Sequence, residues 1–149
     1  MFVMDAVRHE FVNLAKVGLA PEKACARLAA SLQAGGERVL ILCADETQAR
    51  EMDRLLWEFD PVSFVPHGLM TEEGAEQEPV LICFGEASNR NQAEILISLY
   101  IPELPFTGGF KHVIQFVPAE DGPELKKARD RYRELKNSGM QLMHTTHLN

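Results

Sequence analysis

Residues 38–48 read RVLILCADETQ, an unbroken apolar run followed by a polar turn. A continuous β-branched and apolar run is typical of a strand that is covered on both faces of a parallel sheet. Asp45 and Gln48 have the spacing of a capping box, which predicts that a helix begins directly after the strand. The helix should run to about Glu58 and bury Ala49, Met52, Leu55 and Leu56. This strand-to-helix step predicts an α/β fold.

The alternation of strand and helix patterns continues on both sides of this stretch. We expect further strands at residues 9–15, 63–67, 80–84, 95–99 and 112–118, and for 95–99 a helix is the alternative. We expect helices at residues 21–34, ended by Gly35 and Gly36, and from a second capping box, Asp121 with Glu124, to Gly139. The pattern predicts one domain over residues 1–149, a three-layer α/β/α Rossmann-like fold with a mostly parallel sheet.

The composition is typical of a globular domain without a membrane-spanning segment. Hydrophobic residues make up 46% of the 149 residues and charged residues 25%, as in ordinary globular domains. No apolar run approaches the ~20 residues that a membrane span needs, and the N-terminus lacks a basic-then-apolar signal pattern. Cys25, Cys43 and Cys83 form no CxxC pair and are expected to be buried, reduced thiols, which favours a cytoplasmic location.

The residues that an enzyme or a cofactor site needs are missing from the sequence. A phosphate-binding loop follows a strand, opens a helix and is rich in glycine, but the turn at residues 44–47 has no glycine. His144 and His147 have no carboxylate or thiolate at metal-ligand spacing, and no Ser or Cys lies in a nucleophile elbow. We therefore expect no metal, no cofactor and no active site. The alternative that stays open is a Rossmann-like nucleotide-binding or small-molecule enzyme domain.

Positive charge gathers on the predicted C-terminal helix, although the chain carries a formal charge of −7. On a helical wheel one stripe holds Lys126, Arg129, Arg133 and Lys136, and the adjoining apolar stripe holds Leu125, Ala128, Tyr132 and Leu135. Lys127 and Arg131 lie on another face, where Asp130 and Glu134 are expected to pair with them. The basic stripe is expected to hold no acidic partner of its own, which favours a binding surface over a solvated helix face.

One class of ligand fits the stripe best. Arginine forks bind carboxylates, and the apolar seam can hold an apolar group, which favours an acidic peptide. Single-stranded nucleic acid is the alternative, but one Tyr makes a poor stacking platform.

A second candidate surface is LLWEFDPVSFVPH, residues 55–67. It gathers Trp57, the only Trp of the chain, with Phe59, Phe64 and Pro66. This composition is typical of a protein-contact anchor and equally typical of core packing at a helix-to-strand turn.

Taken in order, these stretches resemble the chi subunit family of the bacterial DNA polymerase III holoenzyme along nearly the whole chain. The resemblance rests on ERVLILCADETQA and LLWEFDPVSFVPH in the centre, followed by ILISL, VIQFVPAED and ARDRYRELKNSGMQL. It implies a nucleotide-binding-like fold without a nucleotide site, in a non-catalytic accessory protein of the clamp-loader assembly. Such proteins bridge the psi subunit and the acidic, Phe-ended C-terminal tail of single-stranded DNA-binding protein, and they therefore associate with DNA indirectly.

The resemblance also implies which residues make these contacts. Arg129, Tyr132 and Arg133 match the tail-binding positions of the family. Leu125 stands where the family can have a lysine, and the neighbouring Lys126 is expected to supply that charge. Tyr132 and Leu125 are expected to wall a slot for the terminal Phe of the tail, with weak, salt-sensitive affinity on the order of micromolar. The psi-facing positions are matched by Trp57 and Phe64, with Pro66 and His67 alongside.

Overall fold

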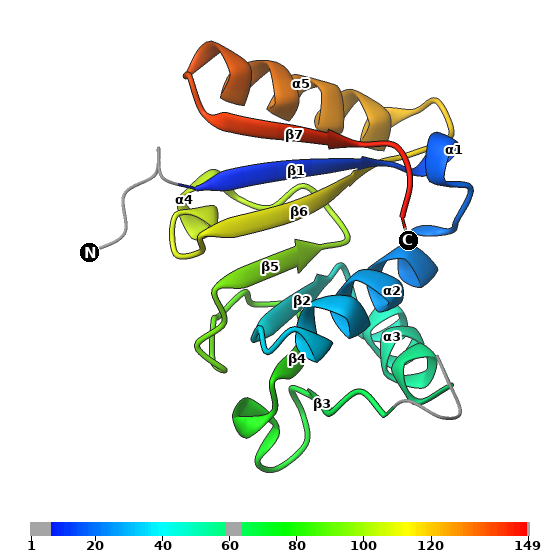
Figure 1. Cartoon of the computed structure of the whole chain (residues 1–149), viewed down its shortest axis with the longest axis vertical. Helices are drawn as coiled ribbons and strands as arrows, with labels where there is room; N and C mark the ends of the chain where they lie inside the picture. The colour runs from blue at the N-terminus through cyan, green and yellow to red at the C-terminus, as the bar shows by residue number, and fades with distance from the viewer. Residues whose placement is uncertain (1–6, 59–63, 149) are drawn as a thin grey trace.

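A computed structural model describes residues 7–58 and 64–148 (Figure 1). Seven strands form one sheet in the order β3-β4-β2-β5-β6-β1-β7, and all of its neighbouring strands run parallel. The strands are β1 (Arg8–Asn13), β2 (Val39–Cys43), β3 (His67–Leu69), β4 (Val80–Phe84), β5 (Ile95–Ser98), β6 (His112–Val117) and β7 (Gln141–Thr145). The helices are α1 (Leu14–Val17), α2 (Pro21–Ala34), α3 (Glu46–Glu58), the 3₁₀ helix η2 (Ala75–Gln77), α4 (Leu104–Thr107) and α5 (Pro123–Asn137).

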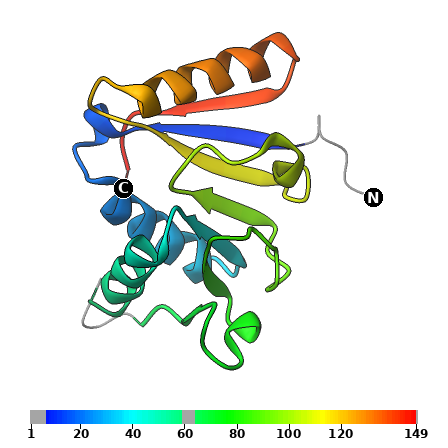
Figure 2. The same ribbon diagram turned by 180° about the vertical axis from the view of Figure 1, so that it is seen from behind.

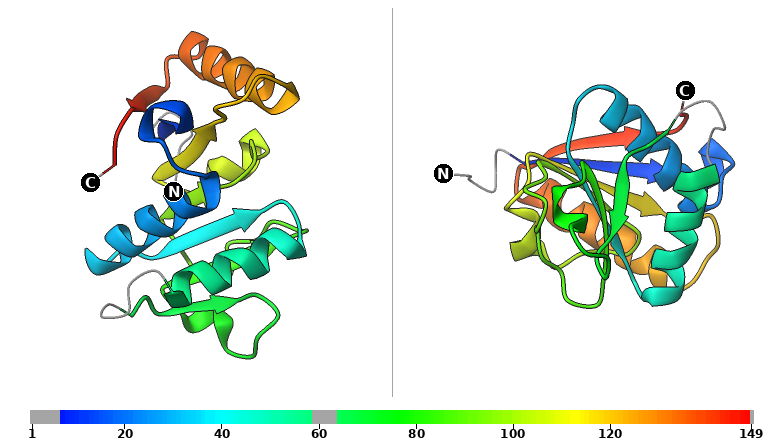
Figure 3. Two further views of the ribbon diagram at one scale, coloured as in Figure 1. Left: turned by 90° about the vertical axis from the view of Figure 1, so that its right-hand side faces the viewer. Right: turned by 90° about the horizontal axis from the view of Figure 1, so that it is seen from below.

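Helices cover both faces of the sheet, as Figures 2 and 3 show. α2 and α3 pack side by side on one face, where Ile41 of β2 and Met52 of α3 belong to the same apolar core. On the opposite face Leu40 of β2 belongs to a second core, against which Phe106 of α4 packs. α5 lies on this second face and packs against β6 and β7. The expected three-layer α/β fold with a mostly parallel sheet is confirmed.

The sequence that follows β2 caps α3 as predicted. The Asp45 side chain accepts a hydrogen bond from the Gln48 N–H at 2.8 Å. The Gln48 side-chain oxygen accepts one from the Ala44 N–H, also at 2.8 Å, one residue further back than a standard capping box. All five residues of β2 are buried, which agrees with a strand covered on both faces.

Two strand boundaries differ from the expectation. The strand expected at residues 9–15 ends at Asn13, because the Asn13 side chain accepts a hydrogen bond from the Lys16 N–H at 3.1 Å and starts α1. The strand expected at residues 63–67 is displaced toward the C-terminus. Residues 64–66 have no strand pairing and β3 begins at His67, since Pro66 has no N–H to give to a neighbouring strand. Residue 63 lies outside the described residues.

The expected cap of the C-terminal helix was wrong. α5 begins at Pro123, so Gly122 is its N-cap, and no side chain caps it. The Asp121 side chain instead accepts a hydrogen bond from the Gly122 N–H at 3.0 Å, and Glu124 lies 3.3 Å from the Lys127 ammonium. Proline is favoured at the first helical position because its fixed φ suits the helix and its missing N–H has no helical partner there.

The sequence reasoning missed β7 altogether. β7 pairs in parallel with β1 and forms the edge of the sheet beside α5. Gly139, with φ of +74°, lets the chain reverse after α5 and enter this strand. The side chains of β7 are exposed or half-buried, so the segment has no apolar run from which a strand could be predicted.

Burial of the three cysteines agrees with the expectation of inert thiols. Cys25, Cys43 and Cys83 are free and buried. Burial raises the pKa of Cys43 to about 12 and that of Cys83 to about 11. Across the described ranges, no helix combines the length and the apolar character needed to cross a bilayer.

Candidate functional site

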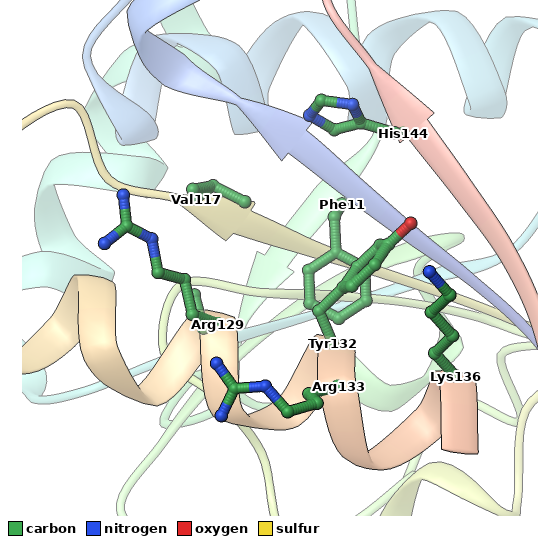
Figure 4. A pocket seen from close by; sticks show the side chains of 8 residues that line it. Phe11, Val117, Arg129, Tyr132, Arg133, Lys136 and His144 are labelled. Atoms are coloured by element: carbon green, nitrogen blue, oxygen red, sulfur yellow. The ribbon is translucent and has the colours of Figure 1, made fainter. Parts of the chain in front are cut away.

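α5 and β7 enclose a cavity of about 470 Å³ on the second face of the sheet. We call it the α5–β7 cavity, and Figure 4 shows the side chains around it. Its lining comes from four elements and consists of Phe11, Val117, Ala128, Arg129, Tyr132, Arg133, Lys136 and His144. Three of the predicted tail-binding residues, Arg129, Tyr132 and Arg133, therefore lie together at one hollow.

Two aromatic rings form the apolar part of this cavity. The Tyr132 ring lies 5.2 Å from the Phe11 ring, centroid to centroid, in an edge-on arrangement. Phe11 is fully buried in β1, whereas Tyr132 is half-buried on α5. Edge-to-face pairs of this kind contribute roughly 0.5–1.5 kcal/mol beyond the burial of their area. Phe11 therefore supports the Tyr132 ring, and both residues line the cavity.

Cations surround this aromatic pair on both sides. In Figure 4 the Arg129 and Arg133 side chains lie on one side of the Tyr132 ring and Lys136 on the other. Within residues 7–58 and 64–148, Arg129 and Lys136 form no salt bridge. An uncompensated guanidinium beside an aromatic ring suits a ligand that carries a carboxylate next to an apolar group.

Asp130 was expected to pair with Lys127 and Arg131, but it reaches the basic stripe instead, which holds no acidic residue of its own. Asp130 lies 2.7 Å from the Lys126 ammonium and 3.5 Å from the Arg133 guanidinium. These two cations lower the pKa of Asp130, chiefly through the hydrogen bond from Lys126. The i,i+4 and i,i+3 spacings let Asp130 reach across to the stripe from its own face of α5. All three side chains are well exposed, so the pairs are weak and a ligand carboxylate can compete for the cations.

Leu125 and Lys126 lie apart from the α5–β7 cavity. Leu125 is only 8% exposed and does not line the α5–β7 cavity, although it was expected to form one of its walls. Lys126 lines a neighbouring hollow that shares Arg129 and Arg133 with the α5–β7 cavity. Phe11 of β1 lines the cavity beside Tyr132, where Leu125 was expected.

Five lining residues were absent from the predicted site, and one of them, Ala128, had been placed on the apolar stripe without a role. Lys136 was placed on the basic stripe but given no role, and His144 was considered only as a metal ligand and rejected. Phe11 and Val117 lie in strands that were expected, but the strand order that brings β1 and β6 under α5 has no signal in a single sequence. The strand alternation that puts Phe11 and Val117 on one face was the available clue.

Arg131 was expected on a paired, exposed face, and the structure shows a more specific role. Its side chain is 13% exposed and lies 3.2 Å from Glu134, as expected. It also donates a hydrogen bond to the Pro102 carbonyl oxygen at 2.7 Å. Arg131 therefore ties α5 to the segment before α4.

The second candidate surface gathers two exposed rings beside a buried histidine. Trp57 is 59% and Phe64 62% exposed, with 5.4 Å between their ring centroids. His67 lies 4.9 Å from Trp57 but is itself buried, with its ring nitrogens 2.7 Å from the Val65 carbonyl oxygen and 3.0 Å from Asp53. The rings of Trp57 and Phe64 are thus on the surface and not in the core. His67 packs against Trp57 and has little exposed surface of its own. Pro66 is half-buried, and Phe59 lies outside the described residues.

Comparison with known proteins assigns the family. The family model described as "DNA polymerase III chi subunit, HolC" matches residues 7–143. The DNA polymerase III subunit chi of Haemophilus influenzae is 38% identical over 125 residues, which cover 83% of this chain and 85% of that protein. The subunit of the same name from Escherichia coli is 39% identical over 124 residues, 83% of each chain, and that from Pseudomonas aeruginosa is 38% identical over 117 residues, 78% of this chain and 79% of that one. The chain therefore belongs to the DNA polymerase III chi subunit family.

Proposed function

We propose that this chain is a cytoplasmic, non-catalytic accessory subunit that links the psi subunit of DNA polymerase III to single-stranded DNA-binding protein. In this proposal the α5–β7 cavity holds the acidic, Phe-ended C-terminal tail of single-stranded DNA-binding protein. The Trp57–Phe64 surface holds psi. The chain meets DNA only through the protein that coats it.

The geometry of the α5–β7 cavity is the observation that carries the tail assignment. A tail that ends in Phe offers a ring, a terminal carboxylate and further carboxylates along the chain. The ring would rest on Tyr132 and Phe11, and the terminal carboxylate would accept hydrogen bonds from Arg129. The preceding carboxylates would run toward the hollow that Lys126 shares with the two arginines. Each contact is exposed or half-buried, so we expect affinity on the order of micromolar that falls as salt rises.

The psi assignment rests on two large exposed rings. Trp and Phe are enriched at the centres of protein interfaces and are costly to leave in water. Trp57 and Phe64 pack against each other at the surface, so the patch is formed before any partner arrives. The hydrogen bonds that hold His67 fix the side chain on which Trp57 rests.

The test of the tail assignment is calorimetric titration with an acidic hexapeptide that ends in Phe. Arg129→Ala removes the guanidinium that has no carboxylate partner among the described side chains, and Arg129→Lys keeps the charge but loses the bidentate fork. Hydrogen bonds to charged groups contribute about 1.5–3 kcal/mol, so we expect Arg129→Ala to weaken binding about tenfold or more. The peptide affinity of Arg129→Lys should lie between those of the parent protein and Arg129→Ala.

The matched control is Arg50→Ala. Arg50 is likewise an exposed helical arginine and pairs with Glu46 on α3. α3 contacts β2, β3 and β4, at the opposite end of the sheet from β7. We expect its variant to bind the peptide like the parent protein. Unchanged affinity in Arg129→Ala, or an equal loss in Arg50→Ala, would reject the assignment of the tail to this cavity.

A further inference from the structure

A second cavity is lined by residues at and beyond the carboxyl ends of β1, β5 and β6. We call it the strand-end cavity. It also has a volume of about 470 Å³. Its walls come from three segments that each follow one of these strands: Leu14 with residues 19–21, residues 99–101, and residues 118–120 with Phe116 before them and Glu124 after them.

The topology explains why a hollow opens at this place. The chain leaves β1 toward α2 on one face of the sheet and leaves β6 toward α5 on the other. In open parallel sheets, such a divergence leaves a crevice outside the strand ends, and ligands bind there. The α5–β7 cavity is separate, because Val117 of β6 faces that cavity while Phe116 faces this one.

The chemistry of the lining argues against a polar small molecule. A metabolite site needs a few convergent buried polar groups in addition to apolar walls. In the described part of the chain, the buried side-chain atoms without a hydrogen-bond partner belong to His9, Asn91 and Gln115, and none of these residues lines the strand-end cavity. Apart from Glu120 and Glu124, the lining residues are apolar except for Tyr100, whose pKa is raised by burial first and by nearby Cys43 and Glu103 next. Such walls suit an apolar side chain.

The charged groups at the cavity are both acidic. Glu120 is exposed and forms no salt bridge with any of the described cations, while Glu124 lies 3.3 Å from the Lys127 ammonium. The rim therefore has the opposite sign to that of the α5–β7 cavity, which carries Arg129, Arg133 and Lys136. An apolar hollow with an acidic rim complements an apolar side chain flanked by Lys or Arg.

We propose that the strand-end cavity is a second peptide-docking site, which takes an apolar side chain next to basic residues from a partner protein. The apolar side chain packs between Leu99 and Phe116, and the adjoining cation pairs with Glu120. The opposite rim charges keep the two ligands apart, because an acidic tail is repelled here and a basic segment is repelled at the α5–β7 cavity. The proposal goes beyond the tail and psi contacts and does not depend on either.

The experiment follows the backbone amide shifts of the ¹⁵N-labelled full chain during titration. The probes are acetyl-Lys-Phe-Lys-amide, its charge-reversed counterpart acetyl-Glu-Phe-Glu-amide, and phenethylamine as a small basic compound. We expect the basic peptide to give saturable shifts at Leu99, Ile101 and Ala119, with a Kd on the order of millimolar for so short a ligand. The acidic peptide should leave these amides unmoved, and phenethylamine should bind at least tenfold more weakly.

Two charge reversals complete the test. Glu120→Lys should weaken binding of the basic peptide about fivefold or more, because it replaces an attraction by a repulsion at the rim. The matched control, Glu73→Lys in the exposed turn before η2, should have no effect. Absence of saturable shifts, equal binding of the two peptides, phenethylamine as tight as the peptide, or an unaffected Glu120→Lys variant would each overturn the proposal. The acidic Phe-ended hexapeptide, titrated into Glu120→Lys, reports separately on the α5–β7 cavity and should bind as before.

Discussion

Acidification should destabilise the fold through His9, which is fully buried in β1. Burial, and after it the nearby charges of Arg131 and His112, lower the pKa of His9 from 6.5 to about 4. Its ring is held neutral in the fold, 3.2 Å from the side-chain amide of Gln115. In the unfolded chain the ring is free to take up a proton near its ordinary pKa.

The sign follows from proton linkage. Between pH 6.5 and about 4 the unfolded chain binds the proton and the folded chain does not, so the free energy of unfolding falls as the pH falls. Well above pH 6.5 neither state is protonated and His9 has no effect on the free energy of unfolding. Protonation of His9 in the unfolded chain lowers the free energy of unfolding by about 2 kcal/mol at about pH 5 and by about 3 kcal/mol below the folded pKa.

The assay is urea unfolding of the parent chain and of His9→Gln, followed by circular dichroism at about pH 7.5 and about pH 5. Other groups titrate in this range, and the difference between the two proteins isolates His9. On acidification, the free energy of unfolding of the variant should fall by about 2 kcal/mol less than that of the parent. An identical loss in the two proteins would refute the reasoning, because His9 would then take up its proton equally in both states.

The remaining predictions concern surface and cap residues. Trp57→Ala should change the free energy of unfolding by less than about 1 kcal/mol in a denaturant titration, because the ring is mostly exposed, yet it should abolish copurification with psi; a large loss of stability would place Trp57 in the core. Asp130→Asn should tighten calorimetric binding of the acidic Phe-ended peptide about two- to fivefold, because it frees Lys126 and Arg133, and weaker binding would contradict this. Asp45→Ala should cost about 1 kcal/mol in the same denaturant titration by removing the cap of α3, with no change in peptide affinity, and a stability equal to the parent's would show that the cap is idle.

The fold could be predicted from the sequence because local signals agree with it. The apolar run of β2, the cap at Asp45 and the Gly35 stop of α2 each appear within a few residues of the element they specify. β7 could not be predicted, since an edge strand that is half-exposed needs no apolar run and is held by pairing with distant β1. The shift of β3 has the same cause, because Pro66 affects pairing with β4 and not the local apolar pattern.

The candidate site was predictable only in its α5 half. Helical periodicity brings Arg129, Tyr132 and Arg133 onto adjoining stripes, and the structure places them at one cavity. The opposite wall comes from Phe11 and His144, which lie more than a hundred residues apart and meet through the strand order. The pairing of Asp130 with the basic stripe depends on side-chain reach, which a wheel of Cα positions does not contain.

Removal of the terminal Phe from the acidic peptide tests the central claim most directly. Burial of a Phe side chain against Tyr132 and Phe11 should contribute about 1.5–3 kcal/mol, so the shortened peptide, with its charges kept equal, should bind about tenfold to a hundredfold more weakly in calorimetry at fixed salt. Equal affinity of the two peptides would mean that the α5–β7 cavity acts as a charged surface alone, and it would contradict the account.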